Sequence, residues 1–178
     1  MPDSPKAHEI VIAGDERLVV RPVRPEDEAA LVEMLARASA GDIRFRCFAA
    51  VKDFPHLLAS RLANIDPRRE TTLIAVAEGS AALMGVVHIV CERVQPDTAE
   101  FDIMVRPDHQ GHGLGYRLMQ EILNEARRRG LSAVEGYVLH DNKTMLQMAQ
   151  ELGFKRIATE GEVVRLRADL GPSSASEA

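Results

Sequence analysis

Apolar residues recur along this chain with two different periods, which predict its strands and helices. From 99 to 105 large apolar residues alternate with other residues, a pattern typical of a strand with one buried face. From Leu114 to Ala126 they recur every four residues instead, and this spacing predicts one apolar face of a helix. The arginines at 127–129 complement the negative end of the helix dipole, and Gly130 suits a left-handed helix end.

The same two patterns, extended over the rest of the chain, predict an alternation of strands and helices. The predicted strands are 9–13, 18–23, 71–78, 82–93, 99–105, 134–139, 154–159 and 162–167. Helices are predicted from Pro25 onward and at 53–64, 114–129 and 142–152, and residues 40–51 are ambiguous. Antiparallel hairpins at the start, followed by a β-α-β-α-β order, indicate a mixed-sheet domain of the α/β or α+β class.

The length and composition of the chain fit one soluble globular domain. A chain of 178 residues, 46% hydrophobic and 28% charged, is long enough to bury roughly 70% of its unfolded surface. We expect a flexible N-terminus at residues 1–7, the folded domain at 8–168 and a disordered tail at 169–178, where small polar residues predominate.

Charge and cysteine content argue against several classes of function. The net charge of −5 gives no reason to expect a nucleic-acid partner. Cys47 and Cys91 are too few and too isolated for a disulfide framework or a zinc site, so we expect no metal and a reducing compartment. The sequence contains neither an apolar leader nor an apolar stretch of membrane-spanning length, and the cytoplasm is the expected location.

The segment between the predicted strand and helix reads Gln110-Gly111-His112-Gly113-Leu114-Gly115. A glycine-rich turn that leads into a helix brings together free backbone N–H groups and the positive end of the helix dipole, which favours an anion. The spacing differs from the Gly-x-Gly-x-x-Gly of dinucleotide folds, and the segment lacks the lysine of nucleotide triphosphate loops. For the glycines alone, a tight turn without a ligand is the alternative.

The Gln-x-x-Gly-x-Gly pattern at 110, 113 and 115 resembles the pyrophosphate loop of the GNAT superfamily of N-acetyltransferases. Residues 20–27 resemble the family's opening strand and helix start, and residues 142–154 resemble its asparagine-to-Leu-Gly-Phe element. The resemblance extends from 18 to 167 and implies a mixed central sheet of about six to seven strands with about four helices. It also implies acetyl-CoA as cosubstrate. From the residues alone, the asparagine can be a plain N-cap and the Leu-Gly-Phe a plain helix end.

Segments 21–27, 44–46 and 99–105 resemble one branch of this family more closely. That branch is the acetyltransferase domain of bacterial protein lysine acetyltransferases that modify acyl-CoA synthetases. The resemblance implies a lysine side chain of a protein as the acceptor. Many relatives in this branch also carry a synthetase-like region or a cyclic-nucleotide-binding domain, neither of which is found in these 178 residues.

The resemblance also implies which residues bind acetyl-CoA. The strand backbone is expected to pair with the pantetheine arm and to polarise the thioester carbonyl, and the loop is expected to bind the pyrophosphate. The expected cosubstrate-binding residues are Ile103, Met104, Val105, Gln110, Gly111, His112, Gly113, Leu114, Gly115, Tyr116, Asn142 and Met145. Met145 and Met148 have packing in the core as their alternative role.

Transfer to lysine requires a proton acceptor, because deprotonating an amine with a pKa near 10.4 costs about 4.6 kcal/mol at pH 7. Glu100 is the predicted general base, since it begins the strand before the loop, where the resembled lysine acetyltransferases place a glutamate. Asp102 shares its strand face and is the rival base. A solvated residue at a strand edge is the alternative for Glu100.

Neither a catalytic tyrosine nor a metal-binding histidine is predicted. Many relatives have a tyrosine seven residues after the asparagine, where this chain has Ala149, so we expect water to protonate the departing thiolate. His8, His56 and His88 have no evident partner in the sequence, and no histidine has metal-ligand spacing.

Three hypotheses for the function follow. The first is a protein lysine N-acetyltransferase with an acyl-CoA synthetase as a candidate substrate. The second is a small-molecule amine N-acetyltransferase, which needs a deep acceptor pocket between residues 40–65 and the strand near 137. The third is an acyl-CoA-binding sensor without turnover, which Glu100 and the intact loop disfavour.

Overall fold

An eight-stranded mixed sheet forms the centre of the protein in a computed structural model, which describes residues 5–38 and 54–171. The strands are β1 (His8–Ile12), β2 (Glu16–Pro22), β3 (Glu70–Ala77), β4 (Leu83–Cys91), β5 (Thr98–Val105), β6 (Ala133–Leu139), β7 (Lys155–Glu160) and β8 (Val163–Asp169). The described helices are α1 (Glu28–Ala36), α3 (Phe54–Ala63), α4 (Leu114–Arg128) and α5 (Lys143–Glu151), with 3-10 turns η1 (Pro25–Asp27) and η2 (Pro107–His109). The strand order is β1-β2-β3-β4-β5-β6-β8-β7, and only the β5–β6 pair is parallel.

The mixed α/β class predicted from the sequence is confirmed, but the sheet has eight strands rather than six to seven. The reason is that the hairpin at each end of the sheet adds an edge strand. β1 is held by Ile10 and Ile12, which are buried in the core, whereas β7 has no fully buried side chain and is held by its pairing with β8. The ambiguous residues 40–51, the 44–46 segment and the chain ends at 1–4 and 172–178 lie outside the described residues.

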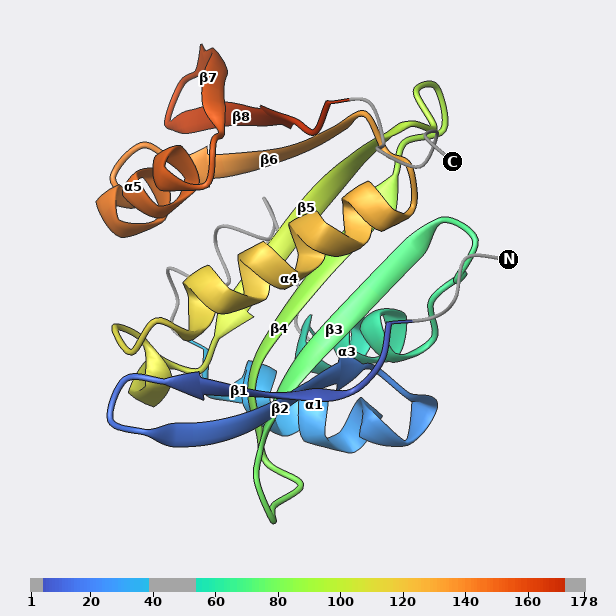
Figure 1. The fold of residues 1–178 in the computed structure, drawn as a ribbon, viewed down its shortest axis with the longest axis vertical. Helices are drawn as coiled ribbons and strands as arrows, with labels where there is room; N and C mark the ends of the chain where they lie inside the picture. Colours follow the sequence, from blue (N-terminus) through green and yellow to red (C-terminus); the bar gives the residue numbers. More distant parts are fainter. Residues whose placement is uncertain (1–4, 39–53, 172–178) are drawn as a thin grey trace, which may run out of the picture.

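The helices cover the two faces of the sheet separately (Figure 1). α4 and α5 pack on one face, where they enclose the larger core together with Phe101 of β5. α1 and α3 pack on the other face, over a second core that contains Met104. Because neighbouring residues of a strand point to opposite faces, Glu100 and Asp102 lie on the same side as Met104, that of α1 and α3.

β5 and β6 pair over a short length and then diverge, as Figure 1 shows. Their register joins Thr98 to Ala133, Ala99 to Val134, and Glu100 to Glu135, and no pairing follows in this part of the described chain. At the point of divergence the ring of Phe101 lies against Gly136, where a Cβ would come within 2.2 Å of a ring carbon. The open edge of β5 beyond Glu100 is where the site described next is found.

Candidate active site

A cleft of about 780 Å³ lies between the open end of β5, the glycine loop and α5. Two stretches of the chain form its walls: the end of β5 with the glycine loop that follows it, and α5, which comes later in the sequence. The lining residues are Ile103, Met104, Val105, Gln110, Gly111, Gly113, Gly115, Tyr116, Asn142, Thr144, Met145, Gln147, Met148 and Glu151.

The glycine loop has the backbone of an anion-binding turn. Gly111 and Gly113 have φ of +80° and +85°, a left-handed conformation that side chains with a Cβ disfavour. Gly113 is the N-cap of α4, so the first N–H groups of this helix have no acceptor within the helix and are available at the cleft. Gln110 donates its amide Nε2–H to the carbonyl oxygen of Val105 at 3.1 Å, which fixes the start of the loop against β5.

The cleft is narrow at Gly115. A Cβ at this position would touch Cγ2 of Val105 at 3.6 Å and Sδ of Met148 at 3.7 Å, so any side chain here would fill the space between β5 and α5. A strand edge, free helix N–H groups and the space that Gly115 leaves between β5 and α5 together suit an extended ligand that carries an anionic group.

Most residues expected to bind the cosubstrate line this cleft, but two have other surroundings. The side chain of Leu114 is 1% exposed and packs in the larger core, so only its backbone N–H is available. His112 does not line the cleft, and its carbonyl oxygen accepts a hydrogen bond from the N–H of Ala13 at 3.1 Å.

Asn142 caps α5, as the N-cap interpretation requires. Its Oδ1 accepts a hydrogen bond from the backbone N–H of Met145 at 3.1 Å. Its amide Nδ2 is not needed for this cap, and the residue also lines the cleft. Capping therefore leaves a donor available to a ligand.

Sequence reasoning missed part of the α5 wall. Thr144, Gln147 and Glu151 line the cleft together with Met148, which had been assigned to the core as one alternative. Their spacing of three and four residues places them on one face of the helix, and this spacing was the available signal. It was not decisive, because a polar face of a helix is usually solvated.

Glu100 is half-buried at the seam where β5 and β6 separate. Burial raises the pKa of its carboxyl group, and the nearby charges of Asp102 and Glu92 raise it further, whereas Arg165 and Arg61 partly offset these effects. No hydrogen-bond donor or ion-pair partner contacts this carboxylate within residues 5–38 and 54–171. A carboxylate with these properties is suited to accepting a proton.

Asp102, the rival base, lies opposite a buried histidine. It pairs in the β4–β5 register with His88, which is 2% exposed and whose Nε2 lies 3.0 Å from Oε2 of Glu70. The expectation that His8 and His88 have no partner was wrong. His88 pairs with Glu70, and Nε2 of His8 lies 3.1 Å from Oε1 of Glu121. Both partners are distant in sequence and come close only through the fold.

Glu135 is directly beside Glu100 in the register but has a different environment. It is 3% exposed and binds Nε of Arg165 at 3.0 Å and Nη1 of Arg167 at 2.7 Å. Burial acts to raise the pKa of Glu135, but the two guanidinium groups outweigh it and lower the pKa. The guanidinium of Arg165 also lies over the ring of Tyr137, 5.9 Å from its centroid.

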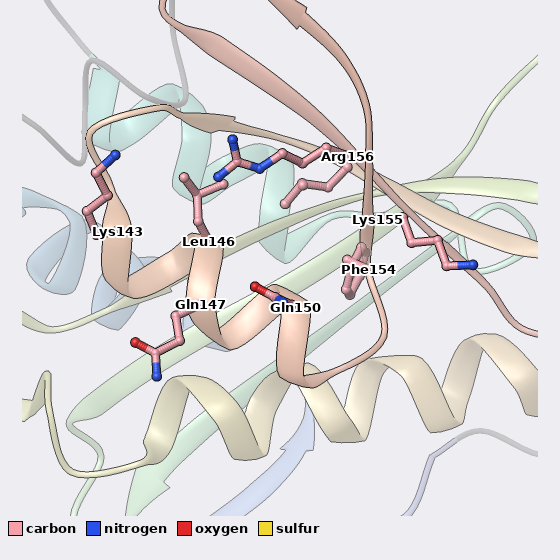
Figure 2. Close-up of a pocket in the computed structure, with 8 residues that line it drawn as sticks. Lys143, Leu146, Gln147, Gln150, Phe154, Lys155 and Arg156 are labelled. Atoms are coloured by element: carbon pink, nitrogen blue, oxygen red, sulfur yellow. The ribbon is translucent and has the colours of Figure 1, made fainter.

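A second hollow of about 510 Å³ lies on the other side of α5 (Figure 2). Leu146, Phe154 and Leu166 provide its apolar lining, and Gln147 borders both this hollow and the cleft. α5 therefore forms a wall between two concave surfaces. Within the described ranges, no three potential metal ligands come together, and no helix combines the length and apolar character needed to span a membrane.

Comparisons with known proteins show which family and which proteins this chain is similar to. The family model described as "Acetyltransferase (GNAT) family" matches residues 38–154. An acetyltransferase of Pseudomonas aeruginosa is 26% identical over 141 residues, which are 77% of this chain and 74% of the relative. An L-amino acid N-acyltransferase of Escherichia coli is 39% identical over 57 residues, 32% of this chain and 33% of the relative.

A solved structure has a similar fold over nearly the whole chain. The GNAT domain of S. lividans PAT superposes with a TM-score of 0.83 at 24% identity, covering 94% of this chain and 99% of that one. The arrangement of strands and helices is thus shared with a solved GNAT domain.

Proposed function

Because the chain belongs to the acetyltransferase (GNAT) family, we propose that it acetylates lysine side chains of a protein, with Glu100 as general base. The coarser activity follows from the family itself: the protein is an N-acetyltransferase, and acetyl-CoA is its cosubstrate. The proposal adds the acceptor and the residues that act on it.

The observation that carries the proposal is the position of Glu100. This carboxylate lies at the inner end of the open β5 edge, without a partner among the described side chains, and burial raises its pKa. A base must be ionised near neutral pH and still bind a proton strongly enough to take it from an ammonium group. A glutamate with a raised pKa meets both requirements better than an exposed one.

The residues of the cleft fit acetyl-CoA when it is divided into its chemical parts. The N–H groups from Gly111 to Tyr116 are suited to the pyrophosphate, and the edge of Ile103 to Val105 can exchange hydrogen bonds with the amides of the pantetheine arm. Asn142 offers its Nδ2 donor. Bound acetyl-CoA supplies a thioester whose carbonyl carbon accepts the nucleophile.

In the proposed reaction the acceptor nitrogen forms a bond to the acetyl carbon as the bond to the CoA sulfur breaks. Glu100 takes the proton from the amine, directly or through water, and the thiolate receives a proton from solvent. Ala149 is buried at the position where a tyrosine acid would stand, which supports a role for water. Backbone N–H groups of the open β5 edge are suited to the negative charge that develops on the carbonyl oxygen.

Support for a protein acceptor comes from the segments that resemble bacterial protein lysine acetyltransferases. A small-molecule amine is the second candidate, favoured by the local match to the E. coli L-amino acid N-acyltransferase. The acceptor pocket that it needs was expected between residues 40–65 and the strand near 137, and 39–53 lie outside the described part of the chain.

Mapping of acetyl-lysines by mass spectrometry, after incubation of the protein with acetyl-CoA and a cell lysate, tests the acceptor. We expect site-specific acetylation that is absent with Glu100→Gln, whereas turnover of free L-amino acids alone would favour the small-molecule candidate.

Substitution in the loop tests the coenzyme site separately. Gly113→Asp adds a side chain at a left-handed position and a negative charge where the pyrophosphate is expected, so acetyl-CoA affinity measured by calorimetry should fall at least about tenfold. Glu160→Gln, an acid-to-amide change at an exposed position of β7, is the control with unchanged affinity. Unchanged affinity in a folded Gly113→Asp variant would contradict the loop assignment.

A further inference from the structure

Two contacts join the β1–β2 hairpin to the glycine loop, although the two are about ninety residues apart in the sequence (Figure 1). The backbone N–H of Ala13, next to the hairpin turn, donates to the carbonyl oxygen of His112 at 3.1 Å. Nε2 of His109 lies 3.0 Å from Oε1 of Glu16, at the start of β2. The family resemblance gave no role to the hairpin tip or to His109.

The first contact determines the direction of a donor in the cleft. In a trans peptide group the carbonyl and the N–H of the next residue point in opposite directions. Since Ala13 binds the carbonyl of His112, the N–H of Gly113 points away from the hairpin. Gly113 lines the cleft and is the N-cap of α4, so this N–H belongs to the expected pyrophosphate site.

This direction needs support from outside the loop. Gly111 and Gly113 flank the His112 segment, and glycine adopts positive and negative φ with similar ease. The peptide plane between His112 and Gly113 can therefore rotate at low cost unless another group holds it. Within the described residues, the hydrogen bond from the N–H of Ala13 holds this peptide plane from the side of the hairpin.

The second contact holds the start of the loop. The His109 side chain is 16% exposed and lies between two carboxylates, since its Nδ1 is 3.2 Å from Oδ1 of Asp108 while Nε2 faces Glu16. Nε of Arg106 donates a hydrogen bond to Oδ1 of Asp108 at 2.7 Å. The backbone N–H of Arg106 in turn donates to the carbonyl oxygen of Met84 in β4 at 2.8 Å. The loop is thus fixed to the sheet on one side and to the hairpin on the other.

We propose that the tip of the β1–β2 hairpin is part of the coenzyme site, and that Glu16 and His109 are positioning residues that hold the glycine loop in its anion-binding orientation. The inference rests on the proposed use of this loop for acetyl-CoA. It extends that proposal, because it assigns cosubstrate affinity to residues that do not touch the cosubstrate.

Calorimetric titration with CoA and steady-state kinetics test the inference with Glu16→Met, His109→Phe and the double variant. Each substitution keeps the approximate size of the side chain and removes the polar contact. We expect the Kd for CoA and the KM for acetyl-CoA to rise roughly three- to tenfold, the effect of losing one charge-assisted hydrogen bond at a partly exposed site. The value of kcat should stay within about twofold, because the reacting groups are unchanged.

The double variant identifies the pair as the cause. If the two side chains act through one contact, the Kd of the double variant should equal that of either single variant. Independent effects would instead multiply. Glu16→Gln, which keeps an oxygen acceptor for His109, should recover most of the affinity. Glu9→Met is the matched control on the same hairpin. Glu9 is exposed and lies 4.0 Å from Arg17, so this variant should bind CoA as the wild type does.

The outcomes separate this inference from the function it rests on. Wild-type protein that binds no CoA would contradict the proposed site, and the hairpin inference with it. Wild-type binding together with unchanged binding by the folded Glu16→Met and His109→Phe variants would overturn the hairpin inference alone. A loss confined to kcat, or independent effects in the double variant, would also overturn it.

Discussion

Glu100 and Glu135 are neighbours in the β5–β6 register, on the same face of the sheet, yet the protein gives them opposite properties. Glu135 is more deeply buried, but Arg165 and Arg167 hold it and lower its pKa. Glu100 is less buried and has no partner in the described chain, and its pKa is raised. The comparison indicates that the placement of the arginines, and not burial alone, sets the direction in which the pKa of each carboxyl group shifts.

Removing the unpaired carboxylate should have the largest effect. Glu100→Gln keeps the size of the side chain but cannot accept a proton, so kcat should fall by about 10²- to 10⁴-fold with little change in acetyl-CoA affinity. Steady-state kinetics at saturating acetyl-CoA check this. If Glu100→Gln retained near-full turnover while Asp102→Asn lost it, Asp102 would be the base.

Removing the paired carboxylate should affect stability instead. Glu135→Gln leaves two guanidinium groups without their carboxylate, and we expect the free energy of unfolding at pH 7 to fall by about 1–3 kcal/mol, since the arginines are partly exposed. Chemical denaturation measures this, with the exposed Glu160→Gln as a control expected within about 0.5 kcal/mol. A loss of kcat at constant stability would show that Glu135 is not structural.

The stability difference should also depend on pH. Because the folded pKa of Glu135 is lowered, its contribution is fully present above the unfolded pKa near 4.3 and is lost as the pH falls through the folded value. Glutamine resembles the protonated glutamate. The wild type and Glu135→Gln should therefore converge in stability as the pH falls through the lowered pKa of Glu135, and a constant difference would contradict the ion-pair explanation.

The smallest expected effect is a shift of the pH profile for kcat/KM, which rises as Glu100 becomes ionised. Asp102→Asn removes a like charge that raises the pKa of Glu100, so the acid limb should move to lower pH. Arg165→Gln removes an opposite charge and should move it to higher pH. Shifts below about one unit are expected for both, and shifts in the same direction would contradict this electrostatic account.

Much of the fold could be predicted because it depends on local patterns. The alternation before the loop and the four-residue spacing after it defined β5 and α4 to within a few residues. The six to seven strands implied by the family resemblance were too few, whereas the eight strand segments predicted from the hydrophobic pattern, β7 among them, are all present.

The glycine loop of the candidate site could be predicted from the sequence, but the pairing of its charged side chains could not. The motif around Gly111 and Gly113 predicted an anion-binding loop, and glycine permits the left-handed backbone that both residues adopt. Nothing local indicates that Arg165 pairs with Glu135 and not with Glu100, since the choice depends on the β6–β8 register. The same limit hid the partner of His88, which lies eighteen residues away on the adjacent strand.

The contact between Phe101 and Gly136 has a consequence for how this protein can change. A Cβ at 136 would meet the aromatic ring at 2.2 Å, so β6 could not keep its present distance from β5 there. The close approach of β5 and β6 at this point thus depends on the missing side chain at 136, in a contact outside the cleft. A substitution at position 136, which does not line the cleft, can therefore change the spacing of the strands beside it. Residue 136 is expected to remain a glycine for as long as residue 101 is phenylalanine.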